Sequence, residues 1–119
     1  MLQNCTHIKK KLSFKKRLEE STKIMKKYPN RIPIYVYKGN NSLIPDIDRK
    51  KYLVPYDLTL GQFMHVIRKR MSLNHEVAIY LFINGMIPAS SNLLISIYNE
   101  HKEDDGFLYI TYSGESTFG

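Results

Sequence analysis

Apolar and polar positions follow two different periods along this chain, and their order predicts alternating helices and strands. Residues 13–28 contain good helix formers and neither Gly nor Pro. Phe14 and Leu18 lie four positions apart, as do Ile24 and Tyr28. The pattern predicts a helix with an apolar stripe and with lysines on the opposite face.

The next segment, Arg31–Lys38, has the period of a strand, in which successive side chains point to opposite faces. We expect one buried face, formed by Ile32, Ile34 and Val36. The other face carries Pro33, Tyr35 and Tyr37.

Three more strands are predicted further along the chain. Lys51–Pro55 is short and carries a lysine and a terminal proline, which suit the edge of a sheet. Residues 77–84 form an apolar, β-rich run that closes on Asn84-Gly85, a turn signal. The last strand is expected over residues 107–112.

Two more helices are predicted between these strands. Thr59 and Gln62 have the spacing of a capping box, which opens a helix that runs to about Met71. Its apolar face contains Leu60, Phe63, Ile67 and Met71. A short helix carrying Leu94, Ile97 and Tyr98 is expected to be capped from within residues 90–92.

A hairpin, a crossing helix and two further strands together predict a β-grasp, in which the helix packs on a mixed sheet. The fold class is therefore α+β, with a four-stranded mixed sheet. Two additional helices are expected before it, over residues 7–12 and 13–28. We expect residues 1–119 to form a single domain, with a helical extension (1–28), a β-grasp core (29–112) and a flexible tail (113–119).

The composition permits one modest core and favours an anionic partner. Of 119 residues 43% are apolar, and 18 basic against 11 acidic residues give a net charge of +7. That charge suits a phospholipid surface, an acidic peptide, tubulin or nucleic acid. The lysines crowded into the first thirty positions fit attraction to anionic head groups or a solvated helix face equally well. The single cysteine, Cys5, cannot form an internal disulfide, which suits a reducing compartment.

No enzyme or metal motif stands out. The sequence lacks a Gly-rich phosphate loop, zinc-ligand spacing and a signature for nucleophilic catalysis. The acids Glu100, Glu103, Asp104 and Asp105 lack the spacing of a calcium loop, and we expect a solvated helix end and turn there. We therefore expect no enzymatic activity, no metal and no cofactor.

The carboxyl end suits covalent attachment. A polar tail over residues 113–119 ends in Gly119. A glycine has no side chain, so it passes a narrow enzyme channel and presents an unhindered carbonyl. A terminal glycine also arises by chance, so the pattern alone leaves this hypothesis open.

The expected edge strand, Lys51–Pro55, suits peptide recognition, because a free edge accepts an extended peptide as an extra strand. Apolar residues would then border two pockets. One set is Pro33, Tyr35, Lys51, Leu53 and Phe107. The other is Tyr52, Val54, Pro55, Leu58, Phe63 and Val66. The competing interpretation is that these residues are ordinary core.

Four stretches of the chain resemble the autophagy-related protein 8 family, which includes the GABA-receptor-associated proteins. They are residues 26–34 (KKYPNRIPI), 46–55 (DIDRKKYLVP), 58–63 with 67–70, and 104–115, which is followed by Thr117-Phe118-Gly119. The stretches occur in order and span residues from about 12 to 119.

The resemblance implies a ubiquitin-like modifier of autophagy that is cytoplasmic and becomes membrane-associated when lipidated. Ubiquitin-type activating and conjugating enzymes would join Gly119 to phosphatidylethanolamine, and a cysteine protease would remove the lipid. On an autophagosomal or other organelle membrane, the protein would recruit receptors that carry an aromatic-x-x-aliphatic motif. Tubulin is a further candidate partner, whereas nucleic acid is not expected.

Carried over by position, the resemblance also assigns site residues. The aromatic pocket would involve Glu20, Ile24, Pro33, Lys51, Leu53 and Phe107. The aliphatic pocket would involve Tyr52, Val54, Pro55, Leu58, Phe63 and Val66. Arg31, Arg49, Lys51 and Arg70 would pair with acids of the motif. Tyr35 replaces a smaller residue in the aromatic pocket, which predicts a shallower pocket that disfavours a Trp anchor.

Two other functions stay open at this point. The chain would keep the fold but differ in chemistry if Gly119 were joined to a protein lysine. It would be a non-conjugated cytoskeletal or trafficking adaptor if the basic helix carried the function.

Overall fold

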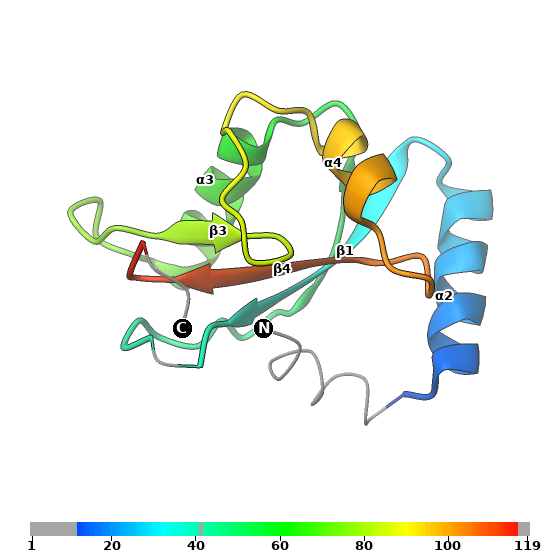
Figure 1. Ribbon diagram of the computed structural model, residues 1–119, viewed down its shortest axis with the longest axis horizontal. Helices are drawn as coiled ribbons and strands as arrows, with labels where there is room; N and C mark the ends of the chain where they lie inside the picture. Colours follow the sequence, from blue (N-terminus) through cyan, green and yellow to red (C-terminus); the bar gives the residue numbers. More distant parts are fainter. Residues whose placement is uncertain (1–11, 41, 117–119) are drawn as a thin grey trace.

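A computed structural model describes residues 12–40 and 42–116 (Figure 1). Its elements are α2 (Phe14–Lys27), β1 (Arg31–Lys38), β2 (Lys51–Pro55), α3 (Leu60–Met71), β3 (Tyr80–Phe82), α4 (Leu94–His101) and β4 (Leu108–Ser113). The helix expected over residues 7–12 lies almost wholly outside the described residues, as does Gly119.

The four strands form one mixed sheet in the order β2-β1-β4-β3. β1 runs parallel to β4, and the other two pairings are antiparallel. The predicted four-stranded mixed sheet is therefore confirmed. The two short strands, β2 and β3, are the edge strands of the sheet, so β2 is an edge strand as predicted.

Both faces of β1 are buried, so the prediction of a single buried face was wrong. Ile32 and Ile34 pack into the main core, whereas Tyr35 and Tyr37, each 5% exposed, join Phe107 and other residues in a second cluster. Ile24 of α2 packs against that second cluster. The N-terminal helix therefore covers the sheet face that the alternation pattern assigned to solvent.

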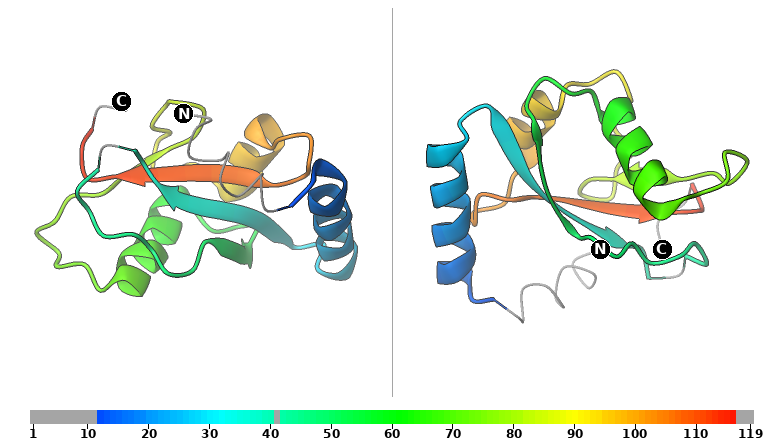
Figure 2. Two further views of the ribbon diagram at one scale, coloured as in Figure 1. Left: turned by 90° about the horizontal axis from the view of Figure 1, so that it is seen from below. Right: turned by 180° about the vertical axis from the view of Figure 1, so that it is seen from behind.

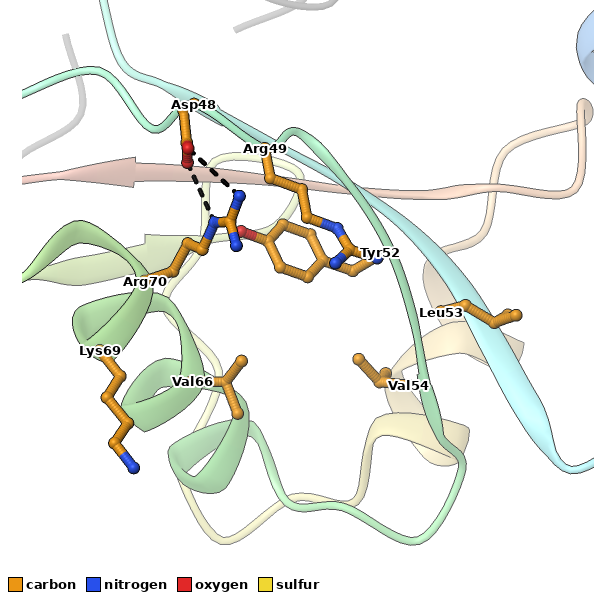
Figure 3. Close-up of a pocket in the computed structure, with 8 residues that line it drawn as sticks. All are labelled: Asp48, Arg49, Tyr52, Leu53, Val54, Val66, Lys69 and Arg70. Atoms are coloured by element: carbon orange, nitrogen blue, oxygen red, sulfur yellow. Dashed lines mark hydrogen bonds and ion pairs between the residues drawn. The ribbon is translucent and has the colours of Figure 1, made fainter.

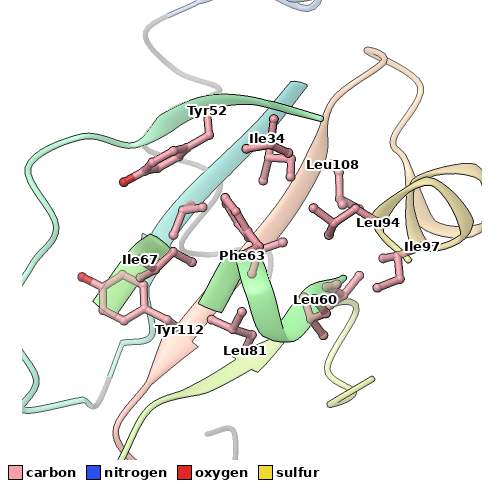
Figure 4. Packing of buried hydrophobic residues seen from close by; sticks show 14 of the residues in the cluster. Ile34, Tyr52, Leu60, Phe63, Ile67, Leu81, Leu94, Ile97, Leu108 and Tyr112 are labelled. Atoms are coloured by element: carbon pink, nitrogen blue, oxygen red, sulfur yellow. The ribbon is translucent and has the colours of Figure 1, made fainter. Parts of the chain in front are cut away.

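The main core lies between the sheet and helices α3 and α4 (Figure 4). Phe63 and Ile67 of α3 are fully buried there, and Phe63 makes an edge contact with Tyr52 at 5.5 Å between ring centroids. Leu94 and Ile97 come from α4. Figure 2 shows α2 set apart from α3, and Figure 1 shows it at the opposite end of the molecule from the carboxyl end of β4.

The structure confirms the helical spans of α2 and α3 but corrects the inward face of α2. Ser13 caps α2, and Thr59 and Gln62 form the predicted capping box on α3. On α2, however, only Ile24 of the predicted apolar stripe packs inward, because Phe14 is 47% exposed and Leu18 and Tyr28 are each 40% exposed. The polar residues Arg17 and Ser21 are buried on the inward face of this helix.

The N-terminus of α4 is not capped by residues 90–92, contrary to the prediction. Leu93 holds the capping position and makes no side-chain cap bond. The amide of Leu94 donates to the carbonyl of Leu58 at 2.8 Å, and the amide of Ile95 donates to Tyr56 at 3.1 Å. These carbonyls satisfy N–H groups that a side chain would otherwise cap.

Strand β3 is shorter than the run over residues 77–84 predicted. Val77 is 40% exposed, and pairing with β4 begins only at Tyr80. At the far end, Asn84 and Gly85 both have positive φ, 52° and 77°, so the predicted turn is present. The last strand is shifted by one residue from 107–112 to Leu108–Ser113.

A buried polar cluster joins α2 to the turn before β4; we call it the Arg17–Asp105 cluster. Asp105 is 2% exposed, which corrects the prediction of a solvated acid at this position, whereas Glu100 and Asp104 are exposed as predicted. Its Oδ2 accepts from Arg17 Nε at 2.9 Å and from the Tyr109 hydroxyl at 2.5 Å. Its backbone carbonyl accepts from the Ser21 hydroxyl at 2.6 Å. Gly106 has φ +85°, and a Cβ there would lie 2.3 Å from Ser21 Oγ, so only glycine fits beneath α2.

The buried tyrosines predict a loss of stability in alkali. Burial raises the pKa of Tyr35 from 10.0 to about 12, and it also raises the pKa of Tyr52, Tyr98, Tyr109 and Tyr112. Below pH 10 these phenols are neutral in both the folded protein and the unfolded chain. Above pH 10 the unfolded chain releases protons that the folded protein retains, so stability falls as pH rises.

We expect each such tyrosine to lower the free energy of unfolding by about 1.4 kcal/mol per pH unit between its unfolded and folded pKa. Urea unfolding followed by circular dichroism at a series of alkaline pH values measures this slope. Tyr35→Phe should make the slope shallower. An unchanged stability above pH 10, with absorbance showing tyrosine ionisation in the folded protein, would contradict the prediction.

Candidate functional site

The outer edge of β2 presents backbone groups to solvent. Just before β2, the carbonyl of Lys50 accepts from the amide of Val36 in β1 at 2.7 Å. Just after β2, the amide of Tyr56 donates to the carbonyl of Asn30, the residue before β1, at 3.0 Å. Residues that bond to the neighbouring strand alternate in an antiparallel pair. The N–H and C=O groups of Lys51 and Leu53 therefore point away from β1. Within the described residues, no strand pairs with this edge.

Two guanidinium groups lie along the same edge. Arg49 donates to the carbonyl of Lys51 at 3.0 Å, and Arg31 donates to the carbonyl of Leu53 at 3.4 Å. Each carbonyl has a second lone pair, so it can still accept from an incoming strand. Pro33 lies opposite Leu53 and lacks an N–H, but the alternation requires no ladder bond at this pair.

One cavity lies between β2 and α3; we call it the α3-side cavity (Figure 3). It encloses about 700 Å³. Tyr52, Leu53, Val54 and Val66 give it apolar walls, and Asp48, Arg49, Lys69 and Arg70 surround its mouth. Its chemistry suits an aliphatic side chain with an acidic neighbour.

The second cavity, the α2-side cavity, lies on the other side of β2. It encloses about 500 Å³ and is lined by Ile24, Arg49, Lys50, Lys51, Tyr52 and Leu53. Beneath it, Tyr35 packs against Phe107 with ring centroids 4.7 Å apart and against Tyr109 at 5.4 Å. Lys51 Nζ lies 6.0 Å from the Tyr35 ring centre and pairs with Glu20 of α2. An aromatic layer thus underlies a basic rim.

The charges around β2 are only partly neutralised. Arg70 forms a two-point ion pair with Asp48, at 3.0 and 3.2 Å. This bond to Arg70 holds the pKa of Asp48 below its ordinary value. Arg49 stacks over the Tyr52 ring at 5.3 Å. Acidic groups of a ligand would meet a surplus of positive charge here.

Two buried oxygens at the site have no hydrogen-bond partner among the described residues: Tyr52 Oη and Glu20 Oε1. Tyr52 is 6% exposed, and burial raises the pKa of its hydroxyl. Figure 3 shows this hydroxyl on the side of the ring toward Arg70. A buried polar atom without a partner costs free energy that a ligand or water can recover.

The structure brings together part of each predicted pocket. Tyr52, Val54 and Val66 line the α3-side cavity, and Ile24, Lys51 and Leu53 line the α2-side cavity. Other assigned residues lie behind these walls: Phe63, Phe107, Pro33 and Tyr35 are buried, and Leu58 packs against the main core. Pro55 is exposed at the end of β2.

Sequence reasoning did not single out Asp48 or Lys69, which stand at the mouth of the α3-side cavity. Both are charged residues on exposed positions, and nothing in their spacing marks them. Their positions follow from the return of α3 alongside β2, which brings Arg70 against Asp48 across a separation of 22 residues.

The described part of the chain offers neither a metal site nor a membrane-spanning helix. No group of three or more His, Cys, Asp or Glu side chains there is arranged to hold a metal ion. None of its helices has the length and apolar character needed to cross a bilayer.

Known proteins of one family match almost the whole chain. Residues 16–119 match the family model described as autophagy protein Atg8, ubiquitin-like. Autophagy-related protein 8a of Arabidopsis thaliana is 56% identical over 103 residues, covering 87% of this chain and 84% of the relative. Autophagy-related protein 8 of Schizosaccharomyces pombe is 55% identical over 114 residues, covering 96% and 94%.

Solved structures show the same fold. Trypanosoma brucei ATG8 superposes with a TM-score of 0.87 at 44% identity, covering 94% of this chain and 97% of that one. Plasmodium falciparum Atg8, solved in complex with a Plasmodium falciparum Atg3 peptide, gives a TM-score of 0.86 at 37% identity, covering 93% and 98%. The chain therefore belongs to the Atg8 family of ubiquitin-like autophagy modifiers.

Proposed function

We propose that this protein binds extended peptides along β2 and is itself joined through Gly119 to phosphatidylethanolamine. The observation that carries the first part is the outward-facing backbone of Lys51 and Leu53, flanked by a cavity on each side. An added strand would bond to this backbone and place its side chains in the cavities. The Plasmodium falciparum relative bound to an Atg3 peptide supports peptide recognition by this fold.

The placement of the two cavities on opposite sides of β2 fits the aromatic-x-x-aliphatic motif that family membership suggests. Successive side chains of a strand point to opposite faces, so residues three apart lie on different sides. The α2-side and α3-side cavities lie on the two sides of β2 in the same way. We assign the aromatic anchor to the α2-side cavity, with Tyr35 and Phe107 beneath it, and the aliphatic anchor to the α3-side cavity. Arg31, Arg49 and Arg70 would pair with acids of the motif.

Tyr35 is expected to set the preference for the aromatic anchor. It is only 5% exposed and fills the space under the α2-side cavity, so a Trp anchor meets a shallow floor. In calorimetry with one motif peptide in Trp, Phe and Tyr versions, Phe or Tyr should bind at least as tightly as Trp. Tyr35→Val should shift the ratio toward Trp. A clear Trp preference in the wild type would refute this assignment.

The second part, lipidation, rests on family membership and on the match of the family model through Gly119. Gly119 lies outside the described residues, and no membrane-spanning helix is present among those described. Covalent lipid would supply the anchor for autophagosomal or other organelle membranes. The same reasoning makes the chain a substrate of activating and conjugating enzymes, and of a delipidating cysteine protease, rather than an enzyme.

Reconstitution tests lipidation directly. With activating and conjugating enzymes and liposomes containing phosphatidylethanolamine, the wild type should form a lipid adduct and Gly119→Ala should lose it almost completely. The methyl group that alanine adds hinders carbonyl activation in a narrow channel. Mass spectrometry of the product identifies the adduct.

Each alternative makes a different prediction in this experiment. A branched peptide in place of a lipid adduct would show that the chain modifies proteins. An adaptor that is not conjugated would stay soluble as wild type and would keep its partners in the Gly119→Ala variant. Either result would overturn the lipidation proposal and leave peptide binding at β2 to be judged on its own measurements.

A further inference from the structure

Leu43 has an unusual exposure for a leucine. It is 94% exposed, whereas the next most exposed large apolar side chain in the described residues, Met86, is 55% exposed. Its two neighbours are buried, with Ser42 at 7% and Ile44 at 6%. Leu43 therefore projects from an anchored segment of the loop between β1 and β2.

That segment is fixed to the place where the tail begins. The Ser42 hydroxyl accepts from the amide of Gly114 at 3.0 Å. The Tyr112 hydroxyl donates to the carbonyl of Pro45 at 2.8 Å and accepts from the amide of Ile47 at 2.7 Å. The segment is thus held against the end of β4 on both sides of Leu43, by Ser42 before it and by Pro45 and Ile47 after it.

A second exposed aliphatic side chain lies next to the same point. A Cβ at Gly114 would lie 3.8 Å from Ile44 Cβ and 3.9 Å from the Ala78 carbonyl, so the chain leaves between the two loops that carry these residues. Val77, which precedes Ala78, is 40% exposed. Figure 1 shows both loops at the end of the molecule where β4 ends. We call Leu43 and Val77 the tail-exit rim.

We propose that the tail-exit rim is a membrane-contact surface, which enters the boundary between lipid head groups and acyl chains after conjugation. The inference rests on the proposed attachment of Gly119 to a phospholipid. Five residues, 115–119, connect Gly114 to the proposed lipid. The end-to-end distance of five residues is at most about 18 Å when fully extended and about 12 Å on average for a flexible chain. Any surface beside Gly114 is therefore held close to the bilayer.

The charges nearby favour an apolar contact over an electrostatic one. Asp46 in the same loop is paired with Lys50 at 2.9 Å. Glu76 precedes Val77, Glu115 follows Gly114, and Lys38 ends β1 opposite Tyr112, so the charges around this surface are mixed and give anionic lipids little advantage. Leucine and valine partition favourably into the interface of zwitterionic lipid. Tethering raises the local lipid concentration enough for two side chains to matter.

A tryptophan reporter tests this contact, because the chain contains no tryptophan. Leu43→Trp is made with Cys5→Ser and Gly119→Cys and is coupled to maleimide-phosphatidylethanolamine in zwitterionic vesicles, which bypasses the enzymes. We expect a blue shift on coupling and loss of emission with lipids brominated on their acyl chains. Val77→Trp should respond in the same direction. Unshifted and unquenched emission from both variants would overturn the proposal.

The matched control is Tyr56→Trp. Tyr56 is 43% exposed and lies past the end of β2, where its amide bonds to Asn30. Tyr56 thus lies beside the start of β1, whereas the tail leaves beside the end of β1. The eight residues of β1 separate these two ends by about 26 Å. Its emission should not change on coupling; an equal response at Tyr56 would show non-specific adsorption and refute the assignment to the rim.

A separate measurement in solution distinguishes an enzyme-docking role. Leu43→Asp should form its thioester with activating enzyme at the wild-type rate if the rim serves the membrane. A several-fold slower thioester, together with a silent Leu43→Trp reporter, would assign the rim to an enzyme and overturn the membrane contact. Failure of enzymatic lipidation itself would count against the proposed function and leave the chemically coupled vesicles able to test the rim.

Discussion

Arg17→Ala is expected to lower the free energy of unfolding by about 3–5 kcal/mol, the usual cost of leaving a buried charge without its partner. Asp105 is 2% exposed, and the Arg17 side chain is 9% exposed, so water cannot readily replace the lost guanidinium. Arg17 also donates to the carbonyl of Leu12 at 2.7 Å, which is lost in the same variant. For a small domain this is a large part of the total stability. Urea unfolding followed by circular dichroism measures it.

A comparison with a double variant that contains no buried charge separates the effect of the unpaired charge from that of lost packing. Asp105→Asn removes the negative charge but keeps an acceptor for the Phe107 amide, which Asp105 binds at 3.0 Å. In the Arg17→Met, Asp105→Asn double variant no buried charge is left, so we expect a smaller loss than in Arg17→Ala. A loss below about 1 kcal/mol in Arg17→Ala would place the pair among ordinary surface ion pairs and contradict its assigned role.

The cluster also links stability to the proposed binding site. It fixes α2 to the turn before β4, and α2 carries Ile24 and Glu20 to the α2-side cavity. We therefore expect Arg17→Ala to reduce the contribution of the aromatic anchor to peptide affinity more than it reduces the contribution of the aliphatic anchor. Peptides with either anchor replaced by alanine report the two contributions separately.

The sequence predicted the sheet well because strand periodicity and turn signals are local. Arg31–Lys38 was located to the residue from its alternation, and the capping box placed the start of α3. What local pattern did not determine was what would cover each face. Tyr35 and Tyr37 are amphipathic, and their burial depends on α2, which lies before β1 in the chain but packs back against it.

The inward face of α2 shows why a buried face cannot be predicted from apolar residues alone when polar residues are buried there. Arg17 and Ser21 are four apart and hence on one face, but neither is apolar. The stripe was therefore assigned to Phe14, Leu18, Ile24 and Tyr28, of which only Ile24 packs inward. Their burial is possible only because Asp105, 88 residues from Arg17, supplies a carboxylate and a carbonyl at the right place. No single-sequence pattern connects residues so far apart. The same limit applies to α4, whose free amides are satisfied by Leu58 and Tyr56 from another loop.

The candidate site was predictable as an edge with two sets of bordering side chains, but not in which of them line open space. Lysine and proline marked Lys51–Pro55 as an outer strand, and the apolar pattern and the family resemblance both named side chains around it. Which of those side chains line space and which lie in the core depends on packing depth. Phe63 and Val66 are three apart on α3, yet Phe63 is fully buried and Val66 is 40% exposed at the cavity wall.

Leu53→Pro is expected to weaken binding of an aromatic-x-x-aliphatic peptide by about 1–3 kcal/mol, or roughly 5- to 150-fold. The outward N–H of Leu53 is the donor that an added strand would use, and proline has none. The peptide carbonyl that loses this donor would be left without a partner against the cavity walls. Proline is tolerated on an edge strand where its nitrogen faces solvent, and Tyr52 is already extended, as a residue before proline must be. Thermal unfolding should therefore show a folded variant.

Leu53→Ala is the matched control, because alanine keeps the N–H and removes only apolar surface that borders both cavities. Strand addition requires the proline variant to bind distinctly more weakly than the alanine variant in calorimetry with the same peptide, since the two differ chiefly in the main-chain donor. If both lose the same affinity, the peptide is held by its side chains alone. Recognition would then be a matter of two pockets, and the free edge of β2 would only determine the distance between them.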